Sequence, residues 1–394
     1  MTTTTTTDNA LKYIPHASLP PPAPFSAPDE LLTSLTRLIT HCPPRTPWRD
    51  DFKNTPRGLW TGPTSIAYLF LHLSLHFPSL SIPSPTDPAT KSPAEWCATY
   101  LACGQSDLPL LTNESGIKNE RAAFLAVSVC LTKDEATIAR FLEVAETLNK
   151  QTRADYNDYL SGRAGLLFLL RLVRSFVPSS AAAVTAAMAP VISHILDAAN
   201  RPWTFNDVRY IGAGHGSLGI LTQLVLSDSC TAYSPEVESE LESLLDQQLD
   251  SGHWYVRASL PDEAELVQWC HGAPGFVISL LAIRACFPSA RLQGRIDKAI
   301  ELGRRDTWER GVLRKEPNLC HGVAGNALAL VGEERRMFMG CATRERIEAG
   351  LESGEFVRGD DKWGLGWGEA GRSWAWMVMA MGRDEAYFAA YTDV

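Results

Sequence analysis

Apolar residues are grouped along this chain into short runs, and each run follows a glycine-containing loop. The commonest form of the loop is Gly-x-x-Gly with a run of apolar positions directly behind it, as in Gly162–Leu170. Copies of the pattern begin at residues 62, 113, 162, 216, 272, 322 and 368, so that successive starts are 46 to 56 residues apart. A repeat of this length accommodates a hairpin of two helices and its loops.

The apolar runs predict helices that are buried on most sides. The first glycine of each loop permits a tight turn, and the second lets the start of the helix pack closely on a neighbour. Between the runs, Asp134–Leu148, Ala181–Ala199 and Glu236–Leu249 carry apolar residues at helical spacing with polar residues between them. These amphipathic segments predict outer helices that cover the inner ones.

Inner and outer helices that alternate seven times predict an all-α fold, a closed (α/α)₇ toroid of helical hairpins. Kelch propellers share a period near 50 residues, but their strands require alternating apolar positions, which are scarce here. The loops of a closed ring converge on one end, and a closed ring is not easily divided. We therefore expect a flexible Thr/Pro-rich arm over residues 1–30 and a single domain over residues 31–394.

Two copies depart from the pattern. In the second copy, Asn113 replaces the first glycine, and residues 117–121 look like an insertion. The seventh copy is rich in tryptophan, with indoles at Trp363, Trp367, Trp374 and Trp376. These side chains predict aromatic packing in the core, with a peptide-binding surface as the alternative.

Composition narrows the class of protein. A formal net charge of −9 argues against a general nucleic-acid binder. No run approaches 18 apolar residues, so no membrane span is predicted. The start, Met1 followed by six Thr, lacks the basic and apolar regions of a secretory signal. The nine cysteines are scattered and odd in number, which indicates reduced thiols in the cytoplasm.

Two of the glycine loops also carry a Cys-His pair, in Trp269–Gly272 and Leu319–Gly322. If the loops converge, Cys270, Cys320 and His321 reach one point. Two thiolates and one imidazole suit Zn²⁺, with a fourth position open for water or substrate. The alternative is that these residues are buried core cysteines and a structural histidine.

The motifs in three of the loops resemble those of the lanthionine synthetase C-like proteins, most closely the eukaryotic branch that binds glutathione. The resemblance rests on Gly212–Gly219, Trp269–Gly275 and Leu319–Asn326, and the repeat layout is similar from about residue 55 to 380. Tyr13-Ile14-Pro15 is similar to the N-terminal signature of that branch. The resemblance implies an (α/α)₇ barrel with one catalytic Zn²⁺ per chain, held by Cys270, Cys320 and His321.

The resemblance also implies catalytic residues around the metal. His215 matches a proposed acid/base in the fourth repeat, and Asp158 matches an acidic residue of the third repeat near the metal. His271 follows a ligand and is expected to contact substrate or support the ligands. The alternatives are a structural or capping role for each histidine and an ordinary helix-terminal carboxylate for Asp158.

Glutathione is anionic, so its binding to an acidic protein requires a local group of cations. Lys315 matches the lysine that the eukaryotic branch uses for the thiol substrate. Lys12 stands where that branch has an arginine, and it lacks the forked geometry of a guanidinium. Arg358 is a third candidate, and for each cation the alternative is a solvated surface charge.

The resemblance, together with these residues, implies a zinc-dependent addition of glutathione to dehydroalanine or dehydrobutyrine in a peptide or protein, with the proton delivered by His215. One alternative is a peptide cyclase that forms lanthionine rings. Another is a non-catalytic adaptor that binds glutathione or zinc and docks on a kinase or, by peripheral contact, on a membrane. A glycosidase would need a pair of acids on the loops, and no convincing pair is present.

Overall fold

The computed structural model describes residues 12–19, 21–45, 57–85, 90–104, 113–197, 201–258, 266–359, 361–383 and 387–394. Within these residues, helices make up nearly all of the regular structure. The two strands, β1 (Ile82–Pro83) and β2 (Thr90–Lys91), form a short antiparallel pair in which Ile82 lies opposite Lys91. The scarcity of strands agrees with the all-α prediction.

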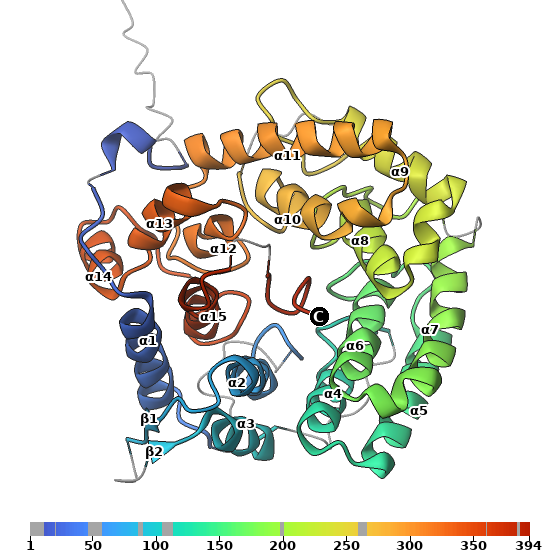
Figure 1. The fold of residues 1–394 in the computed structure, drawn as a ribbon, viewed down its shortest axis with the longest axis horizontal. Helices are drawn as coiled ribbons and strands as arrows, with labels where there is room; N and C mark the ends of the chain where they lie inside the picture. The colour runs from blue at the N-terminus through green and yellow to red at the C-terminus, as the bar shows by residue number, and fades with distance from the viewer. Residues whose placement is uncertain are drawn as a thin grey trace, which may run out of the picture.

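One set of helices forms an inner ring (Figure 1). They are α2 (Pro63–His76), α4 (Glu120–Thr132), α6 (Arg163–Phe176), α8 (Ser217–Ser227), α10 (Ala273–Ile283), α12 (Val323–Ala327) and α15 (Glu369–Ala380). The last of them, α15, packs against the first, α2, and so closes the ring. The starts of these helices are those predicted from the glycine loops, with one exception described below.

The outer ring covers the inner one. It consists of α1 (Ala27–His41), α3 (Pro93–Ala102), α5 (Glu135–Gln151), α7 (Ala181–Leu196), α9 (Pro235–Asp246), α11 (Ala290–Arg310), α13 (Gly332–Gly340) and α14 (Arg344–Glu352). Short 3₁₀ helices lie at His16–Ser18, Pro178–Ser180, Ser229–Tyr233 and Arg284–Cys286. Most outer helices pack on the inner helix that precedes them, but α1 packs on α15, so the two ends of the chain complete one hairpin (Figure 1).

The glycines act as the sequence suggests. Gly272 precedes α10 with φ of 128°, a conformation that side-chain-bearing residues rarely adopt. A Cβ on Gly275 would lie 2.1 Å from the carbonyl oxygen of Trp269, so only glycine fits against the loop there. Behind this loop, α10 is buried almost all round, as an inner helix must be.

The second repeat corrects the predicted start at residue 113. Its inner helix begins at Glu120, and Asn119 occupies the capping position that glycine holds in the other six repeats. The Asn119 side chain accepts a hydrogen bond from the Ala122 amide, which satisfies a helix-terminal N–H. Residues 117 and 118 therefore belong to the loop itself and are not an insertion.

A segment from Tyr387 to Val394 fills the centre of the inner ring (Figure 1). Arg171 of α6 donates to the carbonyl oxygen of Tyr391 at 2.9 Å, and the Tyr68 hydroxyl donates to Asp393 at 2.5 Å. Phe388 stacks on Trp269 with ring centroids 4.5 Å apart. The core therefore continues from the outer layer to the axis of the ring.

The predicted arm lies partly on the body of the protein. Residues 1–11 and 20 are outside the described residues. Ile14 is buried and its amide donates to Val312 at 2.7 Å, while His16 packs on Trp308 with ring centroids 4.0 Å apart. Helix α1 begins at Ala27, so the predicted boundary at residue 30 falls inside a helix.

One stretch of the described residues, Pro178–Leu196, has the length and apolar composition of a membrane span, and 28% of it is buried inside the protein. It contains α7, which packs on α5 and α6 as part of the outer ring. Its composition alone therefore gives weak evidence for a span.

Candidate metal and thiol site

The loops before the seven inner helices are joined into a closed belt by backbone hydrogen bonds. In most loops the bonded residue lies two positions before the residue that caps the inner helix. In the first two loops a residue adjacent to that position also takes part. The bonds run from Leu59 N–H to Ile117 O (2.9 Å), Lys118 to Leu160 (3.1 Å), Leu160 to Gly214 (3.3 Å), Gly214 to Cys270 (3.1 Å), Cys270 to Cys320 (3.3 Å), Cys320 to Gly366 (3.0 Å) and Gly366 to Trp60 (2.9 Å). The loops therefore converge at one end of the toroid, as predicted.

The belt explains how the two cysteines meet. Cys270 and Cys320 occupy the same position in adjacent loops, and the amide of one donates to the carbonyl of the other. The ligand atoms of Cys270, Cys320 and His321 all lie within 4.8 Å of one another. The Asn318 side chain accepts a hydrogen bond from the His321 amide at 2.9 Å and shapes the turn that lets neighbouring residues share one site.

The electrostatics of the pair favour a thiolate. The hydrogen bond to Cys320, together with burial, raises the pKa of Cys270. Burial opposes ionisation of Cys320, but hydrogen bonds from Cys270 and His321 outweigh it and hold the pKa of Cys320 well below its usual range. Two sulfurs and an imidazole, largely withdrawn from water, are the donor set of a zinc centre with an open position. The residues therefore fit Zn²⁺.

The structure places Asp158 and His215 in direct contact. The Asp158 carboxylate is buried and accepts a hydrogen bond from His215 Nδ1 at 2.9 Å. The same oxygen accepts the amides of Leu160 and Ser161 at 3.1 and 3.0 Å, which fixes the carboxylate. Phe205 stacks on the imidazole at a centroid distance of 4.2 Å. The His215 side chain is 21% exposed, so Nε2 is the nitrogen left to meet a substrate.

His271 lies beside this pair. Its ring centroid is 6.4 Å from that of His215 and 5.5 Å from that of Tyr210. His215, His271 and His321 each directly precede the glycine that caps an inner helix. Three successive loops thus present an imidazole at the same level of the ring.

The three predicted cations lie on three chain segments that pair through backbone hydrogen bonds, here called the ladder. Lys12 O accepts the Arg314 amide at 3.1 Å, and Lys315 forms a β-bridge with Val357, the residue before Arg358. Lys12 and Arg358 are exposed, whereas Lys315 is partly buried. The Lys315 ammonium donates to Gln268 at 3.4 Å, two residues before Cys270. The ladder therefore extends from the Cys270 loop to the surface.

A family model described as lanthionine synthetase C-like protein matches residues 54–337, more than half of the chain. The chain belongs to this family. A solved structure of nisin cyclase has the same fold, with a TM-score of 0.58 and 15% sequence identity over 91% of this chain and 96% of that one. The likeness confirms the predicted (α/α)₇ architecture.

Two curated relatives are similar over shorter stretches. LanC-like protein GCL1 of Arabidopsis thaliana is 27% identical over 254 residues, 59% of this chain and 54% of the relative. Glutathione S-transferase LANCL1 of Danio rerio is 32% identical over 123 residues, 30% of this chain and 29% of the relative. The matches thus span about half of the first relative and under a third of the second. The family includes proteins named as enzymes.

The tryptophans of the seventh repeat divide between core and site. Trp374 and Trp376 are buried in the core, as the favoured interpretation predicted. Trp367 is partly exposed, and its ring centroid lies 6.4 Å from that of His321. Its indole helps to lower the pKa of the Cys320 thiol. Sequence reasoning missed this contact, although Trp367 also directly precedes a capping glycine.

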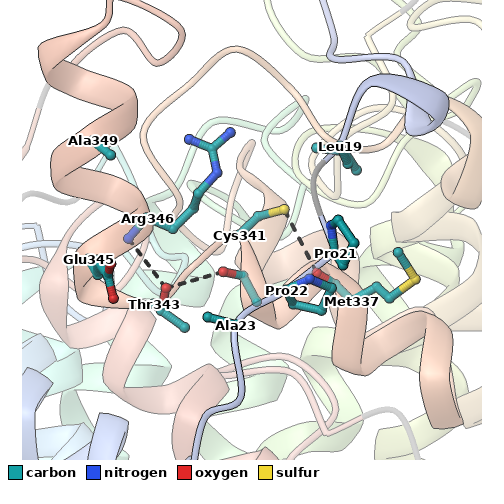
Figure 2. A pocket seen from close by; sticks show the side chains of 11 residues that line it. Leu19, Pro21, Pro22, Ala23, Met337, Cys341, Thr343, Glu345, Arg346 and Ala349 are labelled. Carbon is teal, nitrogen blue, oxygen red and sulfur yellow. Dashed lines mark hydrogen bonds between the residues drawn. The ribbon is translucent and has the colours of Figure 1, made fainter.

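A pocket elsewhere on this family member contains none of the predicted site residues (Figure 2). It lies between the N-terminal segment and α13–α14 and is lined by Leu19, Pro21, Pro22, Met337, Cys341 and Arg346, among others. Its only thiol belongs to Cys341, whose pKa burial raises to about 11. A protonated, buried thiol is a poor nucleophile, so Cys341 is not a second site for thiol chemistry.

Proposed function

We propose that the protein adds glutathione to dehydroalanine or dehydrobutyrine residues of a peptide or protein. The observation that carries the proposal is the cluster of Cys270, Cys320 and His321, whose ligand atoms lie within 4.8 Å of one another. The Asp158–His215 pair occupies the neighbouring loops of the same belt. The name of the zebrafish relative, a glutathione S-transferase, supports the choice of thiol.

A zinc ion held by these three residues would lower the pKa of a substrate thiol and so supply a thiolate at neutral pH. The protein's own residues then bind and orient the substrates. Lys315, Arg358 and Lys12 lie on one ladder next to the metal loops and would receive the carboxylates of glutathione. The partly buried Lys315 is the strongest of these partners, because its charge is least screened by water.

The glutathione thiol first releases its proton to the solvent. The thiolate sulfur then forms a bond with the β-carbon of the acceptor, and the electron pair of the double bond moves toward the acceptor carbonyl. The α-carbon then takes a proton. His215 donates this proton from Nε2, while Asp158 holds Nδ1 and stabilises the protonated ring. His271, 6.4 Å away between ring centroids, assists by positioning the acceptor.

The experiment is to incubate the purified protein with zinc, glutathione and a dehydroalanine peptide that also contains one cysteine. The proposal predicts a product whose mass has increased by one glutathione. An internal thioether of unchanged mass would instead indicate a cyclase, the activity named for nisin cyclase. Glutathione binding without any product would indicate an adaptor, and either result would contradict the proposal.

Glutathione chemistry requires reduced thiols. All nine cysteines lie in the described residues, and none of them forms a disulfide there. We extend the proposal to a reducing compartment, the cytoplasm, where disulfides are rare. Localisation of the tagged full-length chain checks this part separately.

A further inference from the structure

The residue directly before each inner-helix cap marks one level of the ring. Around the belt these residues are Thr61, Lys118, Ser161, His215, His271, His321 and Trp367. Four of them already have a role in the site. His215 is the proposed proton donor and His271 lies beside it. His321 is a candidate metal ligand, and Trp367 acts on Cys320. Lys118 occupies the same level in the second repeat and is the one amine among the seven.

The surroundings of Lys118 lead to the same site. Its amide donates to Leu160 at 3.1 Å, in the loop that carries Asp158. Burial lowers the pKa of Lys118, while the negative charge of Asp158 acts most strongly in the opposite direction and Cys320 also contributes. The carboxylate behind His215 and the Cys320 sulfur thus both favour the charged form of Lys118.

Lys118 is distinct from the cations assigned to glutathione. Those three lie on the ladder beside the sixth and seventh loops. In the belt, the loop that caps α2 lies between the seventh loop and the loop of Lys118. A substrate held between the metal ligands and Lys118 would therefore meet a positive charge on the side away from the glutathione carboxylates.

We propose that Lys118 is a catalytic residue that donates a hydrogen bond to the acceptor carbonyl oxygen. This inference rests on the proposed function. When the carbon–sulfur bond forms, the displaced electron pair places negative charge on that oxygen as an enolate. The ammonium of Lys118 stabilises the charge and keeps its own proton, and the α-carbon receives its proton from His215. Donors aimed at developing charge commonly supply the largest share of catalysis.

The test compares Lys118→Met, which keeps the length of the side chain but removes the charge, with Lys118→Arg, which keeps the charge. Lys298→Met is the matched control, because Lys298 is exposed on the outer helix α11. For each full-length variant the zinc content, the Kd for glutathione and the kcat for a dehydroalanine peptide are measured. We expect Lys118→Met to lower kcat by about 10²- to 10³-fold, with zinc content and glutathione affinity unchanged and partial recovery in Lys118→Arg.

A second readout separates charge stabilisation from a structural effect. An acceptor with a thioester in place of the amide forms a more stable enolate, so it depends less on an external donor. The ratio of wild-type to Lys118→Met rates should therefore be smaller for the thioester than for the amide, whereas a misfolded variant would lose both rates equally.

The outcomes are distinguishable. If the wild-type protein forms no glutathione adduct, the proposed function fails and the role of Lys118 fails with it. If the wild type is active and Lys118→Met keeps the same kcat, only the Lys118 inference is overturned. A weaker Kd for glutathione with unchanged kcat would assign Lys118 to the thiol pocket and would equally overturn it.

Discussion

Two histidine–aspartate pairs in this protein have opposite surroundings. At the rim, His215 is 21% exposed and lies 2.9 Å from Asp158. In the lumen, His72 is 1% exposed and lies 3.7 Å from Asp393. Burial lowers the pKa of His72 to about 3 and raises the pKa of Asp393 to about 6. The lumenal pair has strongly shifted pKa values but no access for a substrate.

The comparison shows that a perturbed pKa by itself does not mark the functional site. Shifted titratable groups gather at active sites, but buried structural networks shift them too. Glu120, whose pKa burial raises to about 7, bonds the Thr64 hydroxyl and the Gly58 amide and holds two loops together. Two properties distinguish the His215–Asp158 pair from the buried His72–Asp393 pair. The first pair is accessible to a substrate, and its residues lie in the belt of loops that also holds the cysteines.

The largest expected effect concerns the metal ligands. Cys270→Ala or Cys320→Ala should reduce bound zinc from about one per chain to background and abolish adduct formation, since three protein ligands are the minimum for such a centre. Metal analysis by mass spectrometry and the adduct assay measure both. Cys230→Ala is the control, because Cys230 is exposed. Full zinc and full activity in either ligand variant would refute the site.

The next effect contrasts the two histidines directly. His215→Gln should lower kcat by about 10²- to 10⁴-fold through loss of the acid/base, with zinc retained. His72→Gln should leave kcat nearly unchanged but reduce the free energy of unfolding by about 1–3 kcal/mol, because a buried hydrogen bond to Tyr387 is disturbed. Rates are compared at a temperature where both variants are folded. If both variants lost kcat equally, His215 would have no catalytic role beyond that of the buried His72.

A smaller effect is the pH dependence that Asp393 contributes. Its folded-state pKa of about 6 lies above the ordinary value of 3.8, so its contribution to stability is fully present below pH 4 and is lost as the pH rises through 6. The loss is on the order of 2–3 kcal/mol. Asp393→Asn can still accept the hydrogen bonds from Tyr68 and Ala390.

Urea unfolding of the wild type and of Asp393→Asn at pH 4 and pH 7.5 measures this contribution. The variant should gain stability relative to the wild type on going from pH 4 to pH 7.5. A difference between the two proteins that is the same at both pH values would show that Asp393 does not titrate in this range.

The smallest effect is expected at the surface end of the glutathione ladder. Lys12 is exposed, and an exposed ion pair contributes at most about 1 kcal/mol, so Lys12→Ala should weaken glutathione binding by no more than about fivefold. Lys315→Met should weaken it more, because Lys315 is partly buried. Titration calorimetry gives both Kd values, and a reversed order would contradict the predicted arrangement of the thiol.

The fold was predictable because each repeat carries its own signal in a short stretch of sequence. A loop glycine such as Gly272 and a following apolar run have a direct physical meaning, and the toroid follows from their number. The start of the second repeat was wrong because Asn119 caps the helix with its side chain, which a search for glycine does not detect. The lumenal segment was missed because nothing local in Tyr387–Val394 indicates where it packs.

The candidate site was predictable in part. The shared Cys-His motif predicted that the two cysteines would meet, and the structure brings their ligand atoms together. The contact between Asp158 and His215 joins residues 57 positions apart, so it depends on the ring and not on local sequence. Lys118 became visible only once the true cap of its helix aligned it with the three histidines of the rim.

The pairing of α1 with α15 has a consequence for synthesis of the chain. The outermost hairpin joins residues near both ends, and the Cys320 amide bonds to Gly366, so the annulus is complete only after the last repeat has left the ribosome. Until then the loop of Cys320 lacks one of its two neighbours in the belt. Contacts between such distant parts of a chain form slowly, so a nascent intermediate would leave this thiol uncovered for a time and would depend on the reducing power of its surroundings.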